Sequence, residues 1–240
     1  PAILAGRGRA GTSGPRGGSR FVAIPQMGTS SRDRSRLVTE AQGHLADGKA
    51  ELAYGLFLQA EGQGARSLGV FVGLGKAAMA LRDADQAEEW WLKASLKAPA
   101  DAECHLGLGT ARYHLGKLSQ AIDSYRRALE LDPSLEGAQV SLAIAYLAAD
   151  CPAQALAHAE QALARAPANV DMRLTRASAL IKLGRAEAAI GDLSWLHGRG
   201  AKLGEVGLLE CEVNRAHGDF EAELMLAAEL AEAFPTLPAP

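Results

Sequence analysis

A spacing of 34 residues recurs along this chain. Residues 102–135, written above residues 136–169, share a small residue at position 8 of each row, alanine at positions 20 and 27, and proline at position 32. These positions hold Gly109, Ala121, Ala128 and Pro133 in the first row and Ala143, Ala155, Ala162 and Pro167 in the second. A period of this length is typical of solenoids built from stacked repeats. It therefore narrows the possible folds more than any other feature of the sequence.

The same frame extends over most of the chain without an insertion. The six rows, numbered here as repeats 1 to 6, cover residues 34–67, 68–101, 102–135, 136–169, 170–203 and 204–237. Position 8 is small in every row, and its occupants are Ala41, Gly75, Gly109, Ala143, Ala177 and Cys211. Proline stands at position 32 in four rows, and alanine replaces it at Ala65 and Ala201.

Each row predicts two amphipathic helices joined by a turn near positions 14–17. Glycine falls in this turn in four rows, and glycine readily takes the positive φ that ends many helices. Small residues at positions 8 and 20 allow two helices to approach closely, and a large residue at position 24 fills the space beside them. Proline at position 32 ends the second helix, because it lacks an N–H group and clashes with the preceding turn. Neighbouring pairs must then stack, since one pair alone cannot complete a core.

This pattern resembles the tetratricopeptide repeat (TPR) family, which has small residues at positions 8, 20 and 27, apolar or aromatic residues at 11 and 24, and proline at 32. Repeats 2 to 4 match best. Glu40, Arg176 and Glu210 occupy position 7, where the family usually has leucine, and Glu223 replaces the small residue at position 20. The resemblance implies an all-α protein, folded over residues 34–237 as a right-handed superhelical solenoid of six helix pairs, with residues 238–240 as its C-terminal end.

Residues 1–33 have a different composition, with seven glycines and five arginines. Such a segment buries too little apolar surface to offset the entropy of ordering its backbone, so a flexible tail is expected. Phe21, Val22 and Ile24 form an apolar stretch within it, which is a candidate for docking as an extended peptide in the groove of this or another copy. The arginine and glycine content leaves RNA contact as an alternative for the tail.

The overall composition favours helices and argues against nucleic acid as the main partner. Of the 240 residues, 48% are apolar but only 5% are aromatic, which reflects a high content of alanine and leucine. The net charge of −3 is too small to indicate a nucleic-acid-binding protein. No run of 18 apolar residues predicts a membrane-spanning helix. A lipid anchor upstream of Pro1 stays open, as does the choice between a cytoplasmic and a periplasmic location.

No arrangement of residues predicts catalysis, a cofactor or a metal site. The six histidines fall at different repeat positions without i,i+4 pairs, and the three cysteines have no short pairing motif. The stretch that ends in Gly75 and Lys76 approximates a phosphate-binding loop, but Val70 stands where its first glycine belongs, and Ala77 replaces serine or threonine. We therefore expect no catalytic residue, no cofactor and no metal, and a protein that is not an enzyme.

The resemblance also implies that the first helix of each repeat lines a concave groove, with positions 2, 5, 9, 12 and 13 facing a ligand. Positions 5 and 12 are apolar in eleven of twelve cases, which predicts a surface for an apolar helix or extended peptide. The alternative for position 5 is packing against the neighbouring repeat. The candidate groove residues are Val72, Lys76, Met79, Leu106, Thr110, Tyr113, Val140, Ile144, Leu147, Leu174, Ser178 and Ile181.

These features lead to the hypothesis of a non-catalytic scaffold that binds a protein partner, with self-association as a further possibility. Two alternatives remain from the resemblance. One is a bacterial envelope accessory protein for pilus or secretin assembly, similar to lipid-anchored pilotin-like TPR proteins. The other is the TPR portion of a larger enzyme, such as a glycosyltransferase.

Overall fold

The computed structural model describes residues 30–200 and 203–233, which contain twelve α-helices and no strand. The helices are α1 (Ser31–Ala46), α2 (Ala50–Gly62), α3 (Leu68–Ala80), α4 (Ala84–Lys97), α5 (Ala102–His114), α6 (Leu118–Leu131), α7 (Glu136–Ala148), α8 (Pro152–Arg165), α9 (Val170–Lys182), α10 (Ala186–His197), α11 (Leu203–His217) and α12 (Phe220–Ala233). The candidate docking segment at Phe21, Val22 and Ile24 lies outside the described residues.

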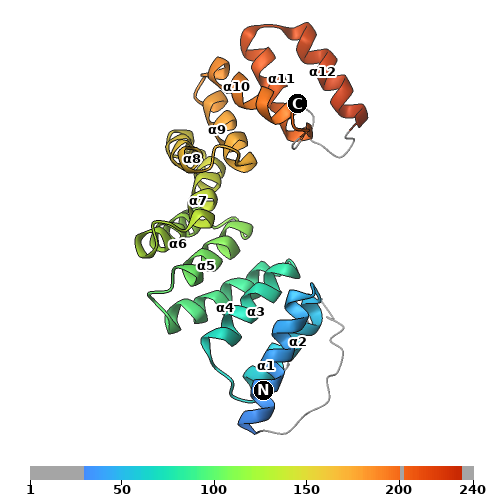
Figure 1. Cartoon of the computed structure of the whole chain (residues 1–240). Coiled ribbons are helices and arrows are strands. Elements are labelled where there is room, and N and C mark those ends of the chain that lie inside the picture. The colour runs from blue at the N-terminus through green and yellow to red at the C-terminus, as the bar shows by residue number, and fades with distance from the viewer. Residues whose placement is uncertain (1–29, 201–202, 234–240) are drawn as a thin grey trace, which may run out of the picture.

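The helices form six pairs that stack into an elongated solenoid (Figure 1). Each pair corresponds to one row of 34 residues, and α1 and α12 lie at opposite ends of the stack. The predicted all-α solenoid of TPR-like helix pairs is thereby confirmed. The first helix begins at Ser31, three residues before the first row, because the Ser30 hydroxyl caps it by accepting the backbone N–H of Asp33.

The first helices of the repeats (α1, α3, α5, α7, α9 and α11, called the inner helices) form one continuous surface. Each inner helix contacts the inner helix of the next repeat, as well as the second helix of its own repeat. The second helices (the outer helices) make no such contacts with one another within the described part of the chain. Because the inner helices lie closer together than the outer ones, their free face is the concave side of the solenoid.

Every turn from an inner to an outer helix places position 15 at positive φ. Glycine occupies the position in four repeats, as Gly48, Gly116, Gly184 and Gly218. Arg82 and Asp150 adopt the same backbone conformation in repeats 2 and 4, with φ of 60° and 55°. The amide after position 15 bonds the carbonyl five residues earlier, as from Lys117 to Arg112 at 2.9 Å, which is the Schellman pattern of helix termination.

The outer helices end near position 32 in one of two ways. In repeats 2 to 4 the helix stops two residues before the proline, and the residue between is extended, as at Ala98 (φ −131°, ψ 75°) before Pro99. The proline ring disfavours the helical conformation of its preceding residue, which explains this break. Repeats 1 and 5 lack the proline, and there Gly64 and Gly200 take positive φ instead.

Large side chains at position 24 fit between small residues of two successive repeats. Trp91 in α4 packs against Gly75 of its own repeat and Gly107 of the next, where a Cβ atom would come within 2.7 and 2.4 Å of the indole ring. Tyr125 makes the equivalent contact with Gly109. The close approach of the helices therefore depends on the small residues that set the period. The alanines at position 20 are fully buried in the same layer: Ala53, Ala87, Ala121, Ala155 and Ala189.

A recurring hydrogen bond joins successive repeats in the middle of the array. A side chain at position 4 of the inner helix donates to the proline carbonyl at position 32 of the preceding repeat. The three pairs are His105 Nε2 to Pro99 at 3.1 Å, Gln139 Nε2 to Pro133 at 3.1 Å and Arg173 Nε to Pro167 at 2.9 Å. These bonds satisfy a carbonyl that has no helical partner.

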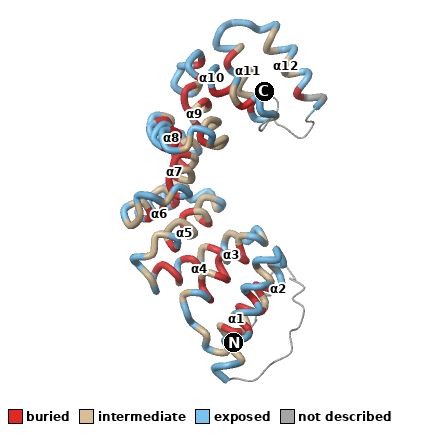
Figure 2. Tube along the Cα trace, in the orientation of Figure 1, coloured by how far each residue is buried: buried red, intermediate tan, exposed pale blue. Residues whose placement is uncertain are grey.

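The core follows the length of the solenoid instead of gathering at one centre. Buried residues occur in every helix pair, along the faces where inner and outer helices meet (Figure 2). Each repeat therefore contacts mainly its neighbours, and the free face of the inner helices is available for another molecule.

Candidate peptide-binding groove

The inner helices present a row of apolar side chains at positions 5 and 12, called here the groove row. Position 5 contributes Val38, Val72, Leu106, Val140, Leu174 and Leu208, and position 12 contributes Leu45, Met79, Tyr113, Leu147, Ile181 and Arg215. Arg215 is exposed, and the other eleven side chains are all half-buried. The row therefore keeps apolar surface in contact with solvent through all six repeats.

The groove row is both part of the packing and part of the surface. Leu106, Tyr113 and Leu147 pack against the core cluster of repeats 3 to 6, and Val140 packs against a smaller cluster beside it, as does Ile144 at position 9. The sequence left open whether position 5 is core or groove. In the structure Val38, Val72, Leu106, Val140 and Leu174 pack against a core cluster and are also partly exposed to solvent.

Position 9 places polar side chains between the apolar ones in every repeat except repeat 4, where it holds Ile144. Lys76 is exposed, whereas Thr110, Ile144 and Ser178 are half-buried. The hydroxyls of Thr110 and Ser178 each donate to the carbonyl four residues earlier, Leu106 and Leu174, both at 2.9 Å. Their oxygen lone pairs remain able to accept a hydrogen bond from a ligand.

A hollow of about 170 Å³ opens in the groove between repeats 3 and 4. Its lining consists of Thr110, Tyr113, His114, Tyr125, Ser141 and Ile144. The Tyr125 hydroxyl donates to Oγ1 of Thr110 over 3.4 Å, and burial raises the pKa of this phenol. The predicted groove residues Thr110, Tyr113 and Ile144 are thus brought together around one depression.

A larger hollow of about 450 Å³ lies beside the turn of repeat 2. Met79, Arg82, Ala84 and His114 line it. His114 borders both hollows, so they form neighbouring depressions along the inner face. Met79 was a candidate from the sequence, whereas Arg82 and Ala84 were not, because they belong to a turn and to an outer helix. His114 stands at position 13 of an inner helix but was not among the candidates.

A second apolar surface occurs on the last helix, outside the groove. Phe220, Leu224 and Met225 of α12 are 62%, 72% and 62% exposed. A hollow of about 350 Å³ opens nearby between α10, α11 and α12, with Ile190, Val213 and Leu226 in its lining. Position 21, where Leu224 stands, contacts the following repeat elsewhere in the array, as Glu88 does by pairing with Arg112.

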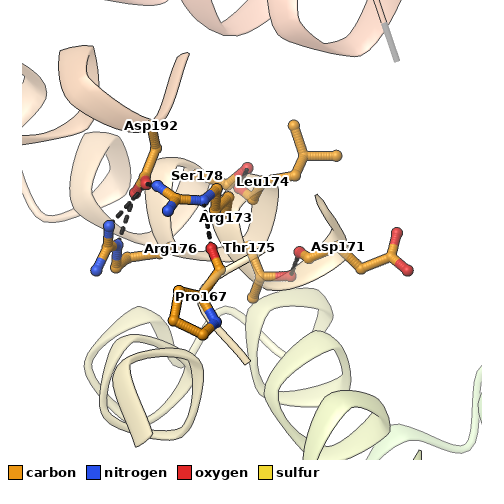
Figure 3. A network of polar contacts seen from close by, with 8 residues as sticks. All are labelled: Pro167, Asp171, Arg173, Leu174, Thr175, Arg176, Ser178 and Asp192. Carbon is orange, nitrogen blue, oxygen red and sulfur yellow. Dashed lines mark hydrogen bonds and ion pairs between the residues drawn. The ribbon is translucent and has the colours of Figure 1, made fainter. Parts of the chain in front are cut away.

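Repeat 5 contains a buried ionic cluster that includes position 7, where repeats 2 to 4 have leucine, and position 23, where repeats 1 and 6 have leucine. Asp192 is only 2% exposed and lies between the guanidinium groups of Arg173 and Arg176 (Figure 3). Arg173 bonds Asp192 at 2.8 Å, and Arg176 bonds both carboxylate oxygens, at 2.6 and 2.7 Å. These bonds raise the pKa of Arg176 above its usual value. The cluster lies between α9 and α10, away from the groove row, so we interpret it as structural.

The remaining reactive groups do not form a site in the part of the chain that the structure describes. Burial raises the pKa of the Cys104 thiol to about 11, which makes it a poor nucleophile. Among the described residues, no group of three or more histidine, cysteine, aspartate or glutamate side chains is placed to hold a metal ion. None of the described helices has the length and apolar content needed to cross a membrane.

Comparisons with known proteins agree with this architecture. Two family models described as tetratricopeptide repeat match residues 102–135 and 140–193. No curated protein sequence matches the chain.

Among solved structures, PilF of Pseudomonas aeruginosa superposes with a TM-score of 0.69 at 19% identity, covering 87% of this chain and 96% of that one. MamA gives 0.63 at 15% identity over 88% and 100% of the two chains. A TPR protein of Parabacteroides merdae gives 0.65 at 13% identity over 85% and 79%. At these identities the similarity concerns the fold.

Proposed function

Because this chain is a tetratricopeptide-repeat protein, we propose that it is a non-catalytic scaffold that binds an apolar helix or extended peptide of a partner protein. The ligand lies along the groove row, on the free face of the inner helices. One observation carries the proposal: eleven of the twelve side chains in the row are apolar and half-buried, from Val38 in repeat 1 to Leu208 in repeat 6. A monomeric protein rarely leaves so continuous an apolar row without a binding role.

The affinity comes from removing apolar surface from water, which contributes about 25 cal/mol per Å² before the costs of association. Burial of the row is incomplete in the free protein, so each side chain has area left to cover. Position 9 favours one orientation of the bound peptide, because Lys76, Thr110 and Ser178 place polar groups between the apolar ones. A partner that alternates apolar and polar side chains fits this pattern.

Site-specific photo-crosslinking in cells tests the proposal. A photoreactive phenylalanine replaces Lys76 or Ser178 in the groove, or Leu96 on outer helix α4 as a control. Leu96 is 73% exposed and outside the groove row. The same partner is expected to crosslink from both groove positions and not from Leu96. Equal crosslinking from all three positions would argue against the groove.

Substitution of Tyr113 in the row and of its neighbour Ile144 at position 9 gives a second test on the captured partner. Tyr113→Ala and Ile144→Asp are expected to abolish its binding while the helical circular dichroism signal persists. Unchanged affinity for both variants would show that the row is not the binding surface.

The accessory role in pilus or secretin assembly is the second candidate. The observation in its favour is that the fold of PilF is matched over nearly all of both chains. The upstream reading frame tests it: a signal peptide ending in a lipidated cysteine supports an envelope protein, and an initiator methionine next to Pro1 opposes it. Self-association through the exposed α12 side chains is tested separately by sedimentation of wild type against Leu224→Asp.

A further inference from the structure

The residue types at position 15 of one repeat and position 13 of the next vary together along the array. Three junctions combine a glycine with an alanine, and these are Gly48 with Ala80, Gly116 with Ala148 and Gly184 with Ala216. The other two junctions have a polar side chain at both positions, and these are Arg82 with His114 and Asp150 with Lys182. A side chain at position 15 is therefore accompanied by a polar one in the next repeat.

At the junction of repeats 4 and 5 the two side chains have opposite charges and bond each other directly. Oδ1 of Asp150 lies 2.9 Å from Nζ of Lys182. Asp150 has a φ of 55°, in the left-handed region that disfavours a residue with a Cβ atom. The ion pair shows that position 15 of one repeat and position 13 of the next lie within reach of each other.

At the junction of repeats 2 and 3 both side chains are basic. Arg82 and His114 are exposed, and both line the hollow of about 450 Å³ beside Met79. His114 contacts the ring of Tyr113, but within the described residues neither basic group has a hydrogen bond or an ion pair. Arg82 has a φ of 60° where four repeats have glycine, so its backbone is strained. This junction therefore keeps a cation at a conformational cost without giving it a partner.

The described lining of the hollow contains no carboxylate. Asp83, which follows Arg82 in the chain, accepts a backbone N–H at the start of α4 over 3.0 Å. Glu88 of α4 is bonded to Arg112 at 3.1 Å and to Lys117 at 2.5 Å. The cations beside the hollow thus have a partner in Glu88, whereas those that line it have none.

We propose that this hollow binds a carboxylate of the partner protein between Arg82 and His114, as Asp150 provides a carboxylate for Lys182. The proposal rests on the proposed function, because Met79 of the groove row borders the hollow and a peptide bound along the row passes beside it. A guanidinium group donates to both oxygens of a carboxylate, and an imidazole has an N–H donor in either tautomer.

Other occupants fit the hollow less well. Arg82 repels a cationic side chain, and an aliphatic side chain forms no bond with either basic group. Residues 1–29 contain no aspartate or glutamate, so the side chains of the tail do not supply the carboxylate.

Nuclear magnetic resonance of the full chain with labelled methionine methyl groups tests this assignment. N-acetyl-aspartic acid α-amide has only a side-chain carboxylate, N-acetyl-alanine has only a terminal one, and N-acetyl-asparaginamide is the neutral control. The Met79 methyl signal is expected to shift saturably with a carboxylate probe and not with the neutral one, while Met225 on α12 does not respond. The stronger of the two carboxylate probes identifies a side chain or a chain end as the source. Added salt should weaken the binding, because exposed charges are screened.

Three variants separate the two basic groups from the general charge of the protein. Arg82→Gln is expected to weaken carboxylate binding by about two- to fivefold, the range for an exposed ion pair. Arg185→Gln is the matched control, because Arg185 is an exposed arginine in the turn of repeat 5 and does not line this hollow. His114→Asp places a carboxylate opposite Arg82, in the arrangement of Asp150 and Lys182 with the charges exchanged. It should abolish the Met79 shift.

The probes can contradict the assignment in three ways. It would be overturned if neither carboxylate probe shifted Met79 saturably, or if the neutral probe caused the same shift. It would also be overturned if the shift were unchanged in both Arg82→Gln and His114→Asp. A shift with inorganic phosphate alone would show that the hollow selects a different anion.

The crosslinked partner distinguishes this inference from the proposed function. If the partner lost affinity in Leu147→Asp but not in Arg82→Gln, the groove would stand and the carboxylate site would fall. If it lost affinity in Arg82→Gln but not in Leu147→Asp, the carboxylate site would stand and binding along the groove row would fall.

Discussion

The indole ring of Trp91 in α4 lies against the Cα atom of Gly107 in α5, in the next repeat. A Cβ atom on Gly107 would approach the ring to 2.4 Å, which no packed structure tolerates without movement. The ring belongs to a buried side chain, 4% exposed, so it has little room to give way. This contact shows how one residue from each of two repeats sets the distance between them.

Gly107→Ala is therefore expected to destabilise the protein by about 1–3 kcal/mol, the usual range for overpacking a core. The control is Gly191→Ala in α10, where an added Cβ meets no atom within 4 Å. Alanine at that exposed helical position should stabilise the protein by about 0.5–1 kcal/mol. Urea unfolding monitored by circular dichroism measures both changes. Stabilisation by Gly107→Ala would contradict the packing described here.

The cluster around Asp192 predicts strong coupling between two positions. Asp192→Leu alone leaves Arg173 and Arg176 without their common partner. The free energy of unfolding should fall by about 3 kcal/mol, which is the lower end for a broken buried pair. The lower end applies because both arginines retain some contact with water. The double variant combines Arg176→Leu at position 7 with Asp192→Leu at position 23. Repeats 2 to 4 already have leucine at position 7, and repeat 6 has leucine at position 23. The double variant should differ from wild type by less than about 1 kcal/mol.

Urea unfolding of the wild type, the two single variants and the double variant completes this cycle. Additive losses from the two single substitutions would show that the cluster does not act as a unit.

The positive φ at position 15 predicts that substitutions in repeats 2 and 3 change the stability of the protein in opposite directions. Gly116→Ala places a Cβ in the left-handed region and should cost about 1–2 kcal/mol. Arg82→Gly relieves the same strain in repeat 2 and should be neutral or stabilising by up to about 1 kcal/mol. Thermal unfolding of both variants checks the pair. A large loss of stability in Arg82→Gly would mean that the arginine side chain, and not its backbone, determines this turn.

His158 predicts a pH dependence of stability. Burial, together with the charge of Arg126, lowers its pKa below the usual 6.5, and its ring stacks on Tyr146 at 5.5 Å. The folded state therefore favours the neutral imidazole. Its contribution to stability is present above the unfolded pKa and is lost as the pH falls through 6.5 towards the folded value.

His158→Phe keeps the stacked ring and removes the titration. Between about pH 7.5 and about pH 5, the wild type should lose more unfolding free energy than this variant. An identical pH profile of both proteins in urea unfolding would contradict the burial of a neutral His158.

Much of the fold was accessible from the sequence because a few small residues determine it. The alanines and glycines at positions 8 and 20 must be small wherever two helices meet, so their spacing reveals the repeat directly. The hydrogen bonds at position 4 also have a counterpart in the sequence. His105, Gln139 and Arg173 follow a repeat that ends in proline, whereas Phe71 and Gly207 follow one that does not.

Other features depend on contacts between distant positions and were not predicted. Arg176 was recognised as a departure from the family pattern, but its partner Asp192 lies 16 residues away on another helix. The hollow in the groove combines Thr110, Tyr113 and Ile144, which were candidates, with Tyr125 and Ser141, which were not. Tyr125 belongs to the outer helix α6, and its hydroxyl bonds Thr110 in α5 and neighbours Ser141 in α7.

The affinity of the crosslinked partner for two aspartate variants tests the groove most directly. Leu147→Asp places a charge in the groove row of repeat 4, and Leu96→Asp places one on the exposed outer side of α4. We expect Leu147→Asp to weaken binding by about a hundredfold, equivalent to roughly 3 kcal/mol, and Leu96→Asp to leave it unchanged. Equal affinities of both variants and the wild type would contradict binding along the inner helices.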